Sequence, residues 1–480
     1  MKKIGILLEC SPYGGGAFQY ARNLYKAIQQ VALKRRVDYC AFIANDEWNS
    51  FFEGESTRII GLSDSYVQNL AIIDGEGCDM LFATNPGDWS GLYTPIVTPI
   101  HDIMHRYEPQ FPEVGEYEEM KEREHLFYKI VENSVGVLVD SNIGKQQVME
   151  IYGRHNEEKI HILPFSVSDY LLEEGTAIDL PFEKYIFYPA QFWRHKNHRN
   201  LLYAILKLRD RGIIVNCIFV GSKKNEYDEI IDIIHKYELT KQVGVLGYVS
   251  NSQMKYLFKN ARAMIMPTFL GPTNIPPIEA MSLGCPVAVS NIYGMPEQLG
   301  DAALYFNPND ILSMATVIED YWIDDELCEK MKKRGLERSE FFSLERFTRD
   351  VDRIITKLDL KNEYKKEQLD GLLEFCNTHS RIVIFGAGRY GFVIKKVLEK
   401  WNIEFDAFVV SKLERMDCDV NPPIYEFDSL EITDDTGIIC SVSGEKQRDI
   451  INMIEHRGIK EENYICFDIT TLEMMKYKYE

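Results

Sequence analysis

Residues 267–286 read Pro-Thr-Phe-Leu-Gly-Pro-Thr-Asn-Ile-Pro-Pro-Ile-Glu-Ala-Met-Ser-Leu-Gly-Cys-Pro, and this stretch is the most informative part of the sequence. The apolar run Ala263–Met266 before it predicts a buried strand, and the Gly, Pro and Asn residues predict a loop after that strand. A helical pattern then begins at about Pro277, with Glu279 in its first turn. Because the first N–H groups of a helix have no partner, this helix end predicts an anion site above the sheet.

Short apolar runs alternate with amphipathic helical patterns along most of the chain. Buried runs that are separated by helices predict βαβ units and parallel sheets. The regular pattern lapses near residues 164–180, so we expect an α/β protein with doubly wound domains at residues 1–170 and 171–360. Ligands of such folds bind beyond the carboxyl ends of the strands, which predicts a site in a cleft between the two sheets. The expected strands are Ile4–Leu8, Asp38–Ile43, Met80–Phe82, Ile96–Pro99 and Val135–Val139 in the first series, and Tyr185–Tyr188, Val215–Val220, Val243–Leu246, Ala263–Met266 and Pro286–Val289 in the second.

A third unit is expected at residues 361–480. A charged stretch at 357–371, helical or linker-like, precedes a strand that opens into Gly386-x-Gly388-x-x-Gly391 and a helix. This fingerprint is typical of a small Rossmann-like domain. A dinucleotide site also needs an acidic residue at the end of the next strand, where this chain has Ser411-Lys412. We therefore expect a nonredox or structural role for this domain in preference to NAD binding.

Composition excludes several classes of protein. The 480 residues carry a net charge of −20, which argues against a general nucleic-acid binder. The one short basic cluster, Lys34-Arg35-Arg36, is expected to be a solvated helix end. The ten cysteines include no Cys-x-x-Cys pair, which argues against a zinc site or a disulfide framework and suits a reducing cytosol. The lone Asp417-Cys418-Asp419 is not interpreted as a metal site, because such pairs occur by chance in acidic chains.

The chain shows no targeting or membrane-spanning pattern. The N-terminal apolar run stops at Glu9, which is too short for the core of a signal peptide, and it predicts a first strand instead. No apolar stretch approaches the length of a transmembrane helix. These patterns predict a cytoplasmic protein.

The stretch at 267–286 resembles the retaining glycosyltransferases of family 4, and the resemblance covers about residues 1–360. In that family a Glu-x7-Glu motif ends in Pro-Pro-x-Glu-Ala, and Glu279 stands at its second Glu. The resemblance implies that Glu279 binds the ribose hydroxyls of the donor and that backbone amides near Asn274 and Ile275 hold the transferred sugar. Gly271 stands at the first Glu, which leaves the donor sugar open. Without the motif, a first-turn carboxylate that complements the helix dipole is the simpler interpretation of Glu279.

Pro99-Ile100-His101-Asp102-Ile103-Met104-His105 follows a strand of the first domain. A His at the carboxyl end of a strand faces the cleft and can exchange protons near neutral pH. The segment resembles the His-Asp element of mannosyltransferase-like members, which implies that His101 lies beside the transferred sugar. A lone His after a strand is otherwise usually structural. We expect His105 to belong to loop structure.

Lys196 lies where the first strand of the second domain gives way to a helix that begins at about His198. An ammonium beside a helix N-terminus stabilises the charge that develops on a departing diphosphate without a metal. By resemblance Lys196 is the phosphate-binding lysine of the family. The companion arginine of the family is replaced by Gln191, and Arg194 is a candidate substitute. An ordinary solvated lysine is the alternative interpretation.

Two weaker signals complete the candidate site. Gly14-Gly15-Gly16 follows the first strand, and glycine permits a close backbone approach to a ligand. By resemblance Gly15 and Gly16 lie near the donor phosphates and the acceptor. Glu297, in Gly-Met-Pro-Glu, recurs in the family near the donor. A glycine triplet after a strand is as often only a turn.

The resemblance implies a GT-B fold, with two Rossmann-like domains facing a cleft, a helix near Phe342–Leu358 that crosses back, and a small C-terminal Rossmann-like domain. The implied reaction is retaining transfer of a hexose from a nucleotide diphosphate sugar to a hydroxyl of a glycan or lipid-linked glycan, with no metal and no cofactor. The His-Asp element favours a mannose-like donor. Such an acceptor allows peripheral association with the inner face of the membrane.

Two alternatives stay open. Because Gly271 and Gln191 replace residues of the family, the chain could be a non-catalytic subunit that binds a nucleotide sugar in an assembly. The Gly386–Gly391 fingerprint also leaves an NAD-dependent sugar-modifying enzyme as a third class.

Overall fold

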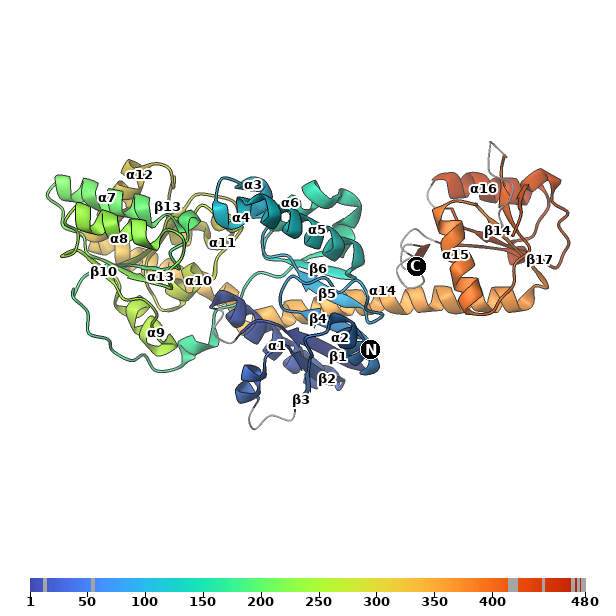
Figure 1. Ribbon diagram of the computed structural model, residues 1–480, viewed down its shortest axis with the longest axis horizontal. Coiled ribbons are helices and arrows are strands. Elements are labelled where there is room, and N and C mark those ends of the chain that lie inside the picture. Colours follow the sequence, from blue (N-terminus) through green and yellow to red (C-terminus); the bar gives the residue numbers. More distant parts are fainter. Residues whose placement is uncertain are drawn as a thin grey trace. The chain divides into compact units, whose positions relative to one another are not determined.

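The computed structural model describes residues 1–11, 15–52, 57–412, 422–442, 445–467, 471, 472 and 475. Gly14 and the Asp417-Cys418-Asp419 segment lie outside these residues. The chain forms two compact units, Met1–Ile355 and Thr356–Glu480. The first unit holds two parallel sheets and the second holds one (Figure 1). Among the described residues, no helix has the length and apolar character that crossing a membrane requires.

The first sheet has seven strands in the order β3-β2-β1-β4-β5-β6-β7, and we call the part of the unit built on it the first sheet domain. The chain runs outward from β1 in one direction and from β4 in the other, so a topological switch lies between these two strands. In such sheets the switch marks the ligand crevice at the carboxyl edge. The strands are β1 (Lys3–Leu8), β2 (Asp38–Ile43), β3 (Arg58–Gly61), β4 (Met80–Ala83), β5 (Ile96–Pro99), β6 (Gly136–Val139) and β7 (Ile160–Ile162). The helices are α1 (Gly16–Arg35), α2 (Tyr66–Gly75), α3 (Met104–Tyr107), α4 (Pro112–Gly115), α5 (Tyr117–Asn133) and α6 (Asn142–Tyr152).

The second sheet has six strands in the order β10-β9-β8-β11-β12-β13, and it defines the second sheet domain. All four residues of β11 and all four of β12 are buried, as expected for central parallel strands with helices on both faces. The strands are β8 (Ile186–Pro189), β9 (Cys217–Val220), β10 (Val243–Val245), β11 (Ala263–Met266), β12 (Val287–Ser290) and β13 (Ala303–Phe306). The helices are α7 (His198–Asp210), α8 (Tyr227–Lys236), α9 (Asn251–Asn260), α10 (Ile275–Ser282), α11 (Met295–Leu299), α12 (Ile311–Ile323) and α13 (Asp325–Ser339).

Short 3-10 helices connect several of these elements. One of them, η4 (Arg194–Lys196), carries the candidate phosphate-binding lysine. The others are η1 (Asp46–Phe51), η2 (Arg154–Lys159), η3 (Asp169–Leu172), η5 (Gly300–Ala302), η6 (Glu340–Phe342), η7 (Phe427–Ser429) and η8 (Glu461–Asn463).

A long helix, α14 (Leu344–Thr378), begins in the first unit and continues past its boundary. Its start matches the helix expected near Phe342–Leu358, and the charged stretch at 357–371 is part of it. Asp352 of α14 accepts hydrogen bonds from Lys34 Nζ at 2.8 Å and Arg35 Nε at 2.6 Å. The cluster lies at the end of α1 with Lys34 exposed, as expected, and Lys34 and Arg35 also tie α1 to α14.

The second unit holds five parallel strands in the order β16-β15-β14-β17-β18. A Cβ added at Gly391 would lie 1.9 Å from the carbonyl oxygen of Gly386, so only glycine allows this close helix–strand packing. The strand that follows, β15, ends at Val410, directly before Ser411. The elements are β14 (Arg381–Phe385), α15 (Arg389–Lys400), β15 (Ala407–Val410), β16 (Ile424–Glu426), β17 (Thr436–Cys440), α16 (Glu445–His456) and β18 (Tyr464–Cys466).

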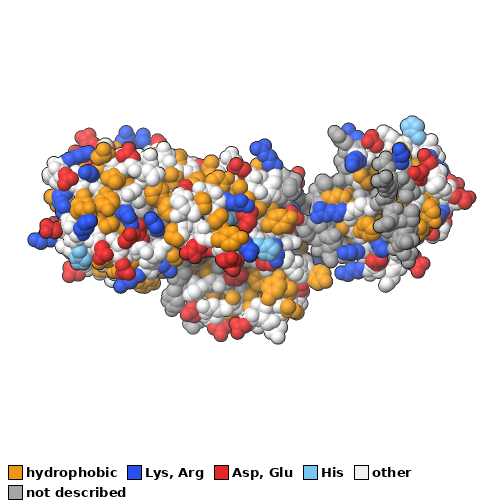
Figure 2. Space-filling view, turned by 45° about the horizontal axis from the view of Figure 1, so that its top comes forward, with side chains coloured by type: hydrophobic (Ala, Val, Ile, Leu, Met, Phe, Trp, Pro, Cys, Tyr) orange, Lys and Arg blue, Asp and Glu red, His pale blue; other side chains and the backbone are white. Residues whose placement is uncertain are grey.

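Basic and acidic side chains are interspersed over the face of the first unit shown in Figure 2. Ion pairs between such side chains occur in this unit, as between Arg211 and Glu319 at 3.0 Å. This mixing fits a chain whose charge argues against nucleic acid.

The helix of the opening stretch begins earlier than expected. α10 starts at Ile275, two residues before Pro277, and Glu279 is therefore not in its first turn. The expectation was wrong because two successive prolines are both tolerated in a first turn, where no N–H would have a helical partner. Dipole complementation by a first-turn carboxylate no longer accounts for Glu279.

Candidate active site

His101 lies two residues after the end of β5, at the carboxyl edge of the first sheet. Its ring packs edge-on against Tyr20 of α1, with ring centroids 4.6 Å apart. Burial lowers the pKa of His101, although the Asp102 carboxylate and a hydrogen bond with the backbone of Thr84 act against this. Nε2 is buried and has no hydrogen-bond partner among the described residues. His101 is therefore a neutral imidazole with one ring nitrogen left for a ligand.

Asp102 is held by the first sheet domain. Its Oδ1 accepts from Arg123 Nη2 of α5 at 2.6 Å and from the backbone N–H of Met104 at 3.1 Å. His105, expected in loop structure, is instead a fully buried residue of α3, with Nε2 3.1 Å from Glu124. That expectation was wrong because a short helix follows the His-Asp element. The contact with Glu124 makes His105 part of the packing beneath the loop.

The turn that carries Lys196 is fixed by hydrogen bonds. Tyr188 donates through its hydroxyl to the carbonyl of Lys196 at 2.8 Å. Asn197, whose φ is 62°, donates through Nδ2 to the carbonyls of Pro267 at 2.9 Å and Pro308 at 3.0 Å. α7 starts at His198, as the sequence predicts. The turn is thereby joined to the ends of β11 and β13.

The ammonium of Lys196 has no hydrogen bond and no ion pair within the described part of the chain. Burial of this group lowers its pKa to about 8, while the carboxylates of Asp102 and Glu113 act in the opposite direction. Contacts of Glu113 with His195 join the lysine turn to the first sheet domain. A partly desolvated cation without a partner is a favourable place for an anion.

Glu113 of α4 is a residue that the sequence did not single out. Its Oε1 accepts from the backbone N–H of His195 at 2.7 Å and lies 2.5 Å from His195 Nδ1, and its Oε2 accepts from Asn225 Nδ2 at 3.0 Å. Burial favours a higher pKa for Glu113, but these hydrogen bonds outweigh it and lower the pKa to about 2. Burial lowers the pKa of His195 to about 4. An ionised Glu113 thus accepts from a neutral His195.

Glu279 is 6% exposed, on α10. Its Oε1 accepts from Ser168 Oγ at 2.5 Å, and Tyr170 bonds the same carboxyl group. Burial raises the pKa of Glu279 to about 7 against the effect of these two donors. Ser168 and Tyr170 come from the segment that links the two sheets, where no motif pointed to them. The carboxyl group is buried, hydrogen-bonded and held at the seam.

The glycine loop meets the start of α10. A Cβ added at Gly16, the first residue of α1, would lie 3.7 Å from Ile275 Cδ1. Gly15 precedes the helix with a φ of 60°, which glycine adopts readily. The first turn of α10 offers fewer donors than the sequence suggested. Asn274 N–H donates to Gln298 Oε1 at 3.1 Å, and the two prolines that follow Ile275 carry no N–H, so Ile275 supplies the free amide of this turn.

Further contacts join the two sheet domains. Glu297 is exposed and accepts from the backbone N–H of Asn142 at 2.9 Å and from its Nδ2 at 2.8 Å. Asp140, after β6, accepts from the N–H of Thr273 at 3.1 Å and from its Oγ1 at 2.5 Å. Burial raises the pKa of Asp140 to about 6. The opening stretch is thus held against the first sheet from two sides.

The described residues contain no group of three or more His, Cys, Asp or Glu side chains that could hold a metal ion.

Residues 180–338 match the family described as glycosyl transferases group 1. The chain is a glycosyltransferase whose second sheet domain matches the group 1 family.

This glycosyltransferase is similar in sequence to two curated mannosyltransferases. It is 26% identical over 261 residues to the O-antigen chain mannosyltransferase B of Escherichia coli, an alignment that covers 52% of this chain and 68% of that protein. It is 30% identical over 185 residues to the O-antigen chain mannosyltransferase RfbU of Salmonella typhimurium, covering 38% of this chain and 50% of that protein. The alignments therefore span half to about two thirds of these relatives.

Solved structures show the fold of the glycosyltransferase. The sucrose-phosphate synthase of Thermosynechococcus elongatus superposes with a TM-score of 0.62 at 16% identity and covers 75% of this chain and 100% of that chain. Anabaena HepE in complex with UDP superposes with a TM-score of 0.57 at 15% identity, covering 74% and 100%. These neighbours confirm the GT-B fold that the resemblance implied.

The glycosyltransferase departs from the family motif at Gly271, and the backbone conformation there favours glycine. Gly271 has a φ of 102°, and an added Cβ would lie 2.9 Å from Asn274 Nδ2 and 3.1 Å from the carbonyl oxygen of Thr273. A glutamate here would need both a different backbone and a displaced Asn274. Gln191, at the position of the missing arginine, accepts from Trp193 Nε1 at 2.8 Å. The loop therefore leaves no room for the glutamate of the family at Gly271 without rearrangement.

Proposed function

We propose that this glycosyltransferase is a retaining enzyme that moves a hexose, with mannose favoured, from a nucleotide diphosphate sugar to a hydroxyl of a glycan or lipid-linked glycan. The names of its relatives support the class of donor and acceptor, since the two curated proteins act in O-antigen chains and HepE was crystallised with UDP. The proposal assigns the donor to the carboxyl edge of the second sheet.

One observation carries the proposal. Lys196 presents a partly desolvated ammonium with no hydrogen bond or ion pair to any described residue, and burial lowers its pKa to about 8. The first turn of α10 offers the amide of Ile275 but none from the two prolines that follow. The charge that develops on a leaving diphosphate would therefore rest mainly on Lys196, because a fixed cation in a low-dielectric site stabilises it without reorganisation.

The remaining residues take supporting roles in the proposal. Glu279 accepts from the ribose hydroxyls of the donor, exchanging a contact with Ser168 or Tyr170 for one with the ligand. Nε2 of His101, which has no hydrogen-bond partner among the described residues, binds the transferred hexose, and that hexose lies beside Asn274 and Ile275. Gly15 and Gly16 allow the first loop to approach the phosphates, and Glu297 borders the donor while it holds Asn142.

The proposed transfer needs no atom or proton beyond those of the two bound substrates. The bond between the anomeric carbon and the phosphate oxygen breaks, and the acceptor hydroxyl attacks the same face of the sugar. The proton of that hydroxyl passes to an oxygen of the departing diphosphate. No side chain has to act as the base, which fits the low pKa of His101.

We further propose that the reaction uses no metal and no bound cofactor. The chain places Ser411 and Lys412 where a dinucleotide site needs a carboxylate, so we assign no NAD to the turn at Gly386, Gly388 and Gly391. We propose action in the cytoplasm, with peripheral association at the inner face of the membrane if the acceptor is lipid-linked.

Ligand-induced stabilisation tests the proposal. The melting temperature would be measured with GDP, UDP, GDP-mannose and UDP-glucose for the wild type, for Lys196→Met and for the exposed control Lys241→Met. A ligand present at 100 times its Kd stabilises by about 2.7 kcal/mol. We expect one nucleotide series to stabilise the wild type and the control, and Lys196→Met to lose ~10- to 100-fold in affinity. If no nucleotide sugar stabilises the wild type, the proposed function is wrong.

A further inference from the structure

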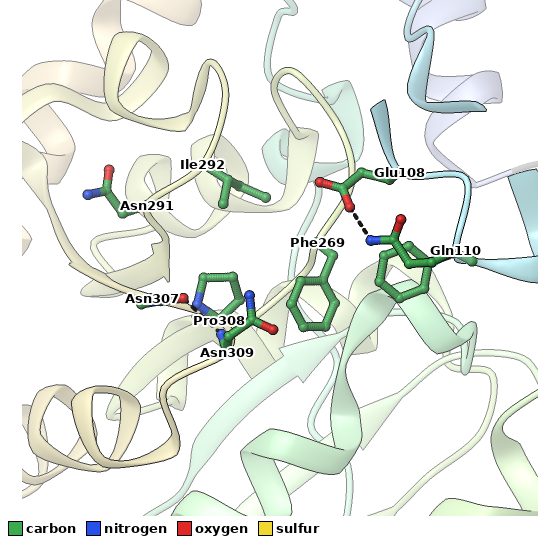
Figure 3. Close-up of a pocket in the computed structure, with 9 residues that line it drawn as sticks. Glu108, Gln110, Phe269, Asn291, Ile292, Asn307, Pro308 and Asn309 are labelled. Atoms are coloured by element: carbon green, nitrogen blue, oxygen red, sulfur yellow. Dashed lines mark hydrogen bonds between the residues drawn. The ribbon is translucent and has the colours of Figure 1, made fainter. Parts of the chain in front are cut away.

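A pocket of about 550 Å³ lies between the two sheet domains, outside the group of candidate residues described above (Figure 3). Gln110 and Phe111 line it from the segment between α3 and α4. Phe269 lines it from the loop after β11, and Asn291 and Asn309 come from the loops after β12 and β13. The volume is in the range of small-molecule sites, about 300–1,000 Å³, and domain interfaces are common places for them.

The lining of this pocket combines amides with an aromatic surface. The side chains of Asn291 and Asn309 are exposed and make no hydrogen bond within the residues that the structure describes. Phe269 is stacked on Phe111, with centroids 5.2 Å apart and an interplanar angle of 28°. Gln110 donates through Nε2 to Glu108, as Figure 3 shows. Free amides bind hydroxyl groups as donors and acceptors, and an aromatic ring packs against apolar C–H surface.

The charges of the lining exclude the phosphate part of the donor. No Lys, Arg or His lines this pocket, and its one ionisable residue is the carboxylic acid Glu108. A diphosphate would meet a carboxylate and no cation here, which disfavours it. The arrangement suits a neutral molecule with hydroxyl groups and an apolar face, which is the chemistry of a hexose.

The pocket lies next to the turn that carries Lys196. The backbone N–H of Phe269 donates to the carbonyl of His195 at 2.8 Å, and His195 directly precedes Lys196. Tyr293, beside the pocket residue Ile292, donates through its hydroxyl to Glu108 of the opposite wall. The two walls are thereby joined, and a ligand in the pocket would lie beside the lysine turn.

We propose that this pocket binds a neutral hexose residue of the acceptor glycan, an inference that rests on the proposed function. The hexose of the donor is the other source of the same chemistry. It is one bond from the diphosphate, so it belongs beside Lys196 and Ile275. The pocket therefore supplies a separate subsite that selects acceptors with a further sugar residue.

Two variants test the subsite without disturbing the core. Asn309→Ala removes an exposed amide, and Phe269→Leu removes the aromatic surface while keeping an apolar contact with Phe111. Asn251→Ala, an exposed amide on α9, is the matched control. Binding of α-linked mannotriose, maltotriose and chitotriose would be measured by ligand-observed NMR. We expect at least one to bind the wild type and the control, with Kd raised about 3- to 10-fold in each pocket variant.

A second measurement separates the two sources of hexose. The thermal shift with GDP, UDP, GDP-mannose and UDP-glucose should be the same in the variants as in the wild type. The difference between the shift with a nucleotide sugar and the shift with its free nucleotide reports binding of the donor hexose. If Asn309→Ala loses this difference, the pocket holds the donor hexose and the acceptor assignment is overturned. It is also overturned if no trisaccharide binds the wild type, or if both variants bind as the wild type does. A protein that binds a trisaccharide here but no nucleotide sugar contradicts the proposed function and not the hexose site.

Discussion

Glu113, in the first sheet domain, holds His195, the residue before Lys196 in the second. The Glu113 carboxylate lies 2.7 Å from the backbone nitrogen of His195 and 2.5 Å from its Nδ1. The position of the lysine turn therefore depends on the closure of one sheet domain on the other. Because misplacement by about 1 Å costs about 100-fold in rate, this contact links domain closure to phosphate binding.

Glu113→Ala should lower kcat/KM by at least about 10-fold, because it leaves His195 without its acceptor and frees the lysine turn. Glu113→Gln should retain more activity, since its amide oxygen can still accept from His195. Steady-state kinetics of the two variants and of the exposed control Glu119→Ala would be compared. Equal kcat/KM in wild type and Glu113→Ala would remove Glu113 from any role in positioning Lys196.

Nucleotide binding should weaken as the pH rises through about 8, the pKa to which burial lowers Lys196. Below that pH the ammonium is charged and attracts the diphosphate, and above it the charge is lost, so affinity should fall by up to ~10-fold per pH unit. Titration of GDP and UDP between pH 7 and 9 checks this. Lys196→Met should bind weakly at every pH in this range. A wild-type Kd that stays constant up to pH 9 is the contrary result.

Glu279 should make stability fall as the pH rises from about 4.5 to 7. Burial raises its pKa to about 7, so the folded protein holds a proton that the unfolded chain releases at lower pH, and unfolding is favoured as the pH rises. Glu279→Gln cannot ionise, so its free energy of unfolding should rise relative to that of the wild type by on the order of 2 kcal/mol between pH 5 and 7.5. Urea unfolding at the two pH values gives this difference. A difference of zero would mean that Glu279 titrates normally.

Gly271→Ala should destabilise the first unit by about 1–2 kcal/mol, because its φ of 102° is unfavourable for any side chain. Gly271→Glu should be at least as unstable and should not raise activity, although it restores the family motif. Gly75→Ala is the control, since an added Cβ there meets nothing within 4 Å. The change in urea midpoint measures these effects. A stable, more active Gly271→Glu would show that the loop can adopt the family conformation.

Much of the fold could be predicted from the sequence, because the central strands are continuous apolar runs. β11 lies at the predicted Ala263–Met266, and α7 begins at the predicted His198. β3, β7, β13 and β16 were not predicted. All four of these strands lie at sheet edges. Strands at an edge are buried on fewer sides and so show a weaker apolar pattern.

The candidate site could be predicted only in part. His101, Lys196 and Glu279 could be proposed from the sequence because each follows or accompanies a strand end with a local motif. The partners that hold this region were not, since Glu113 and His195 are 82 residues apart and Asp140 and Thr273 are 133 apart. Such pairs depend on how the two sheets face each other, and no local pattern encodes that.

Turnover with analysis of the new anomeric centre tests the central claim most directly. GDP-mannose and UDP-glucose would be incubated with mannotriose, maltotriose and chitotriose, and nucleoside diphosphate release would be measured with ¹H NMR of the product. The account predicts transfer from one α-linked donor to give an α-linked product, with the rate lowered by ~10- to 100-fold in Lys196→Met. A β-linked product, or equal turnover by Lys196→Met and wild type, would contradict it.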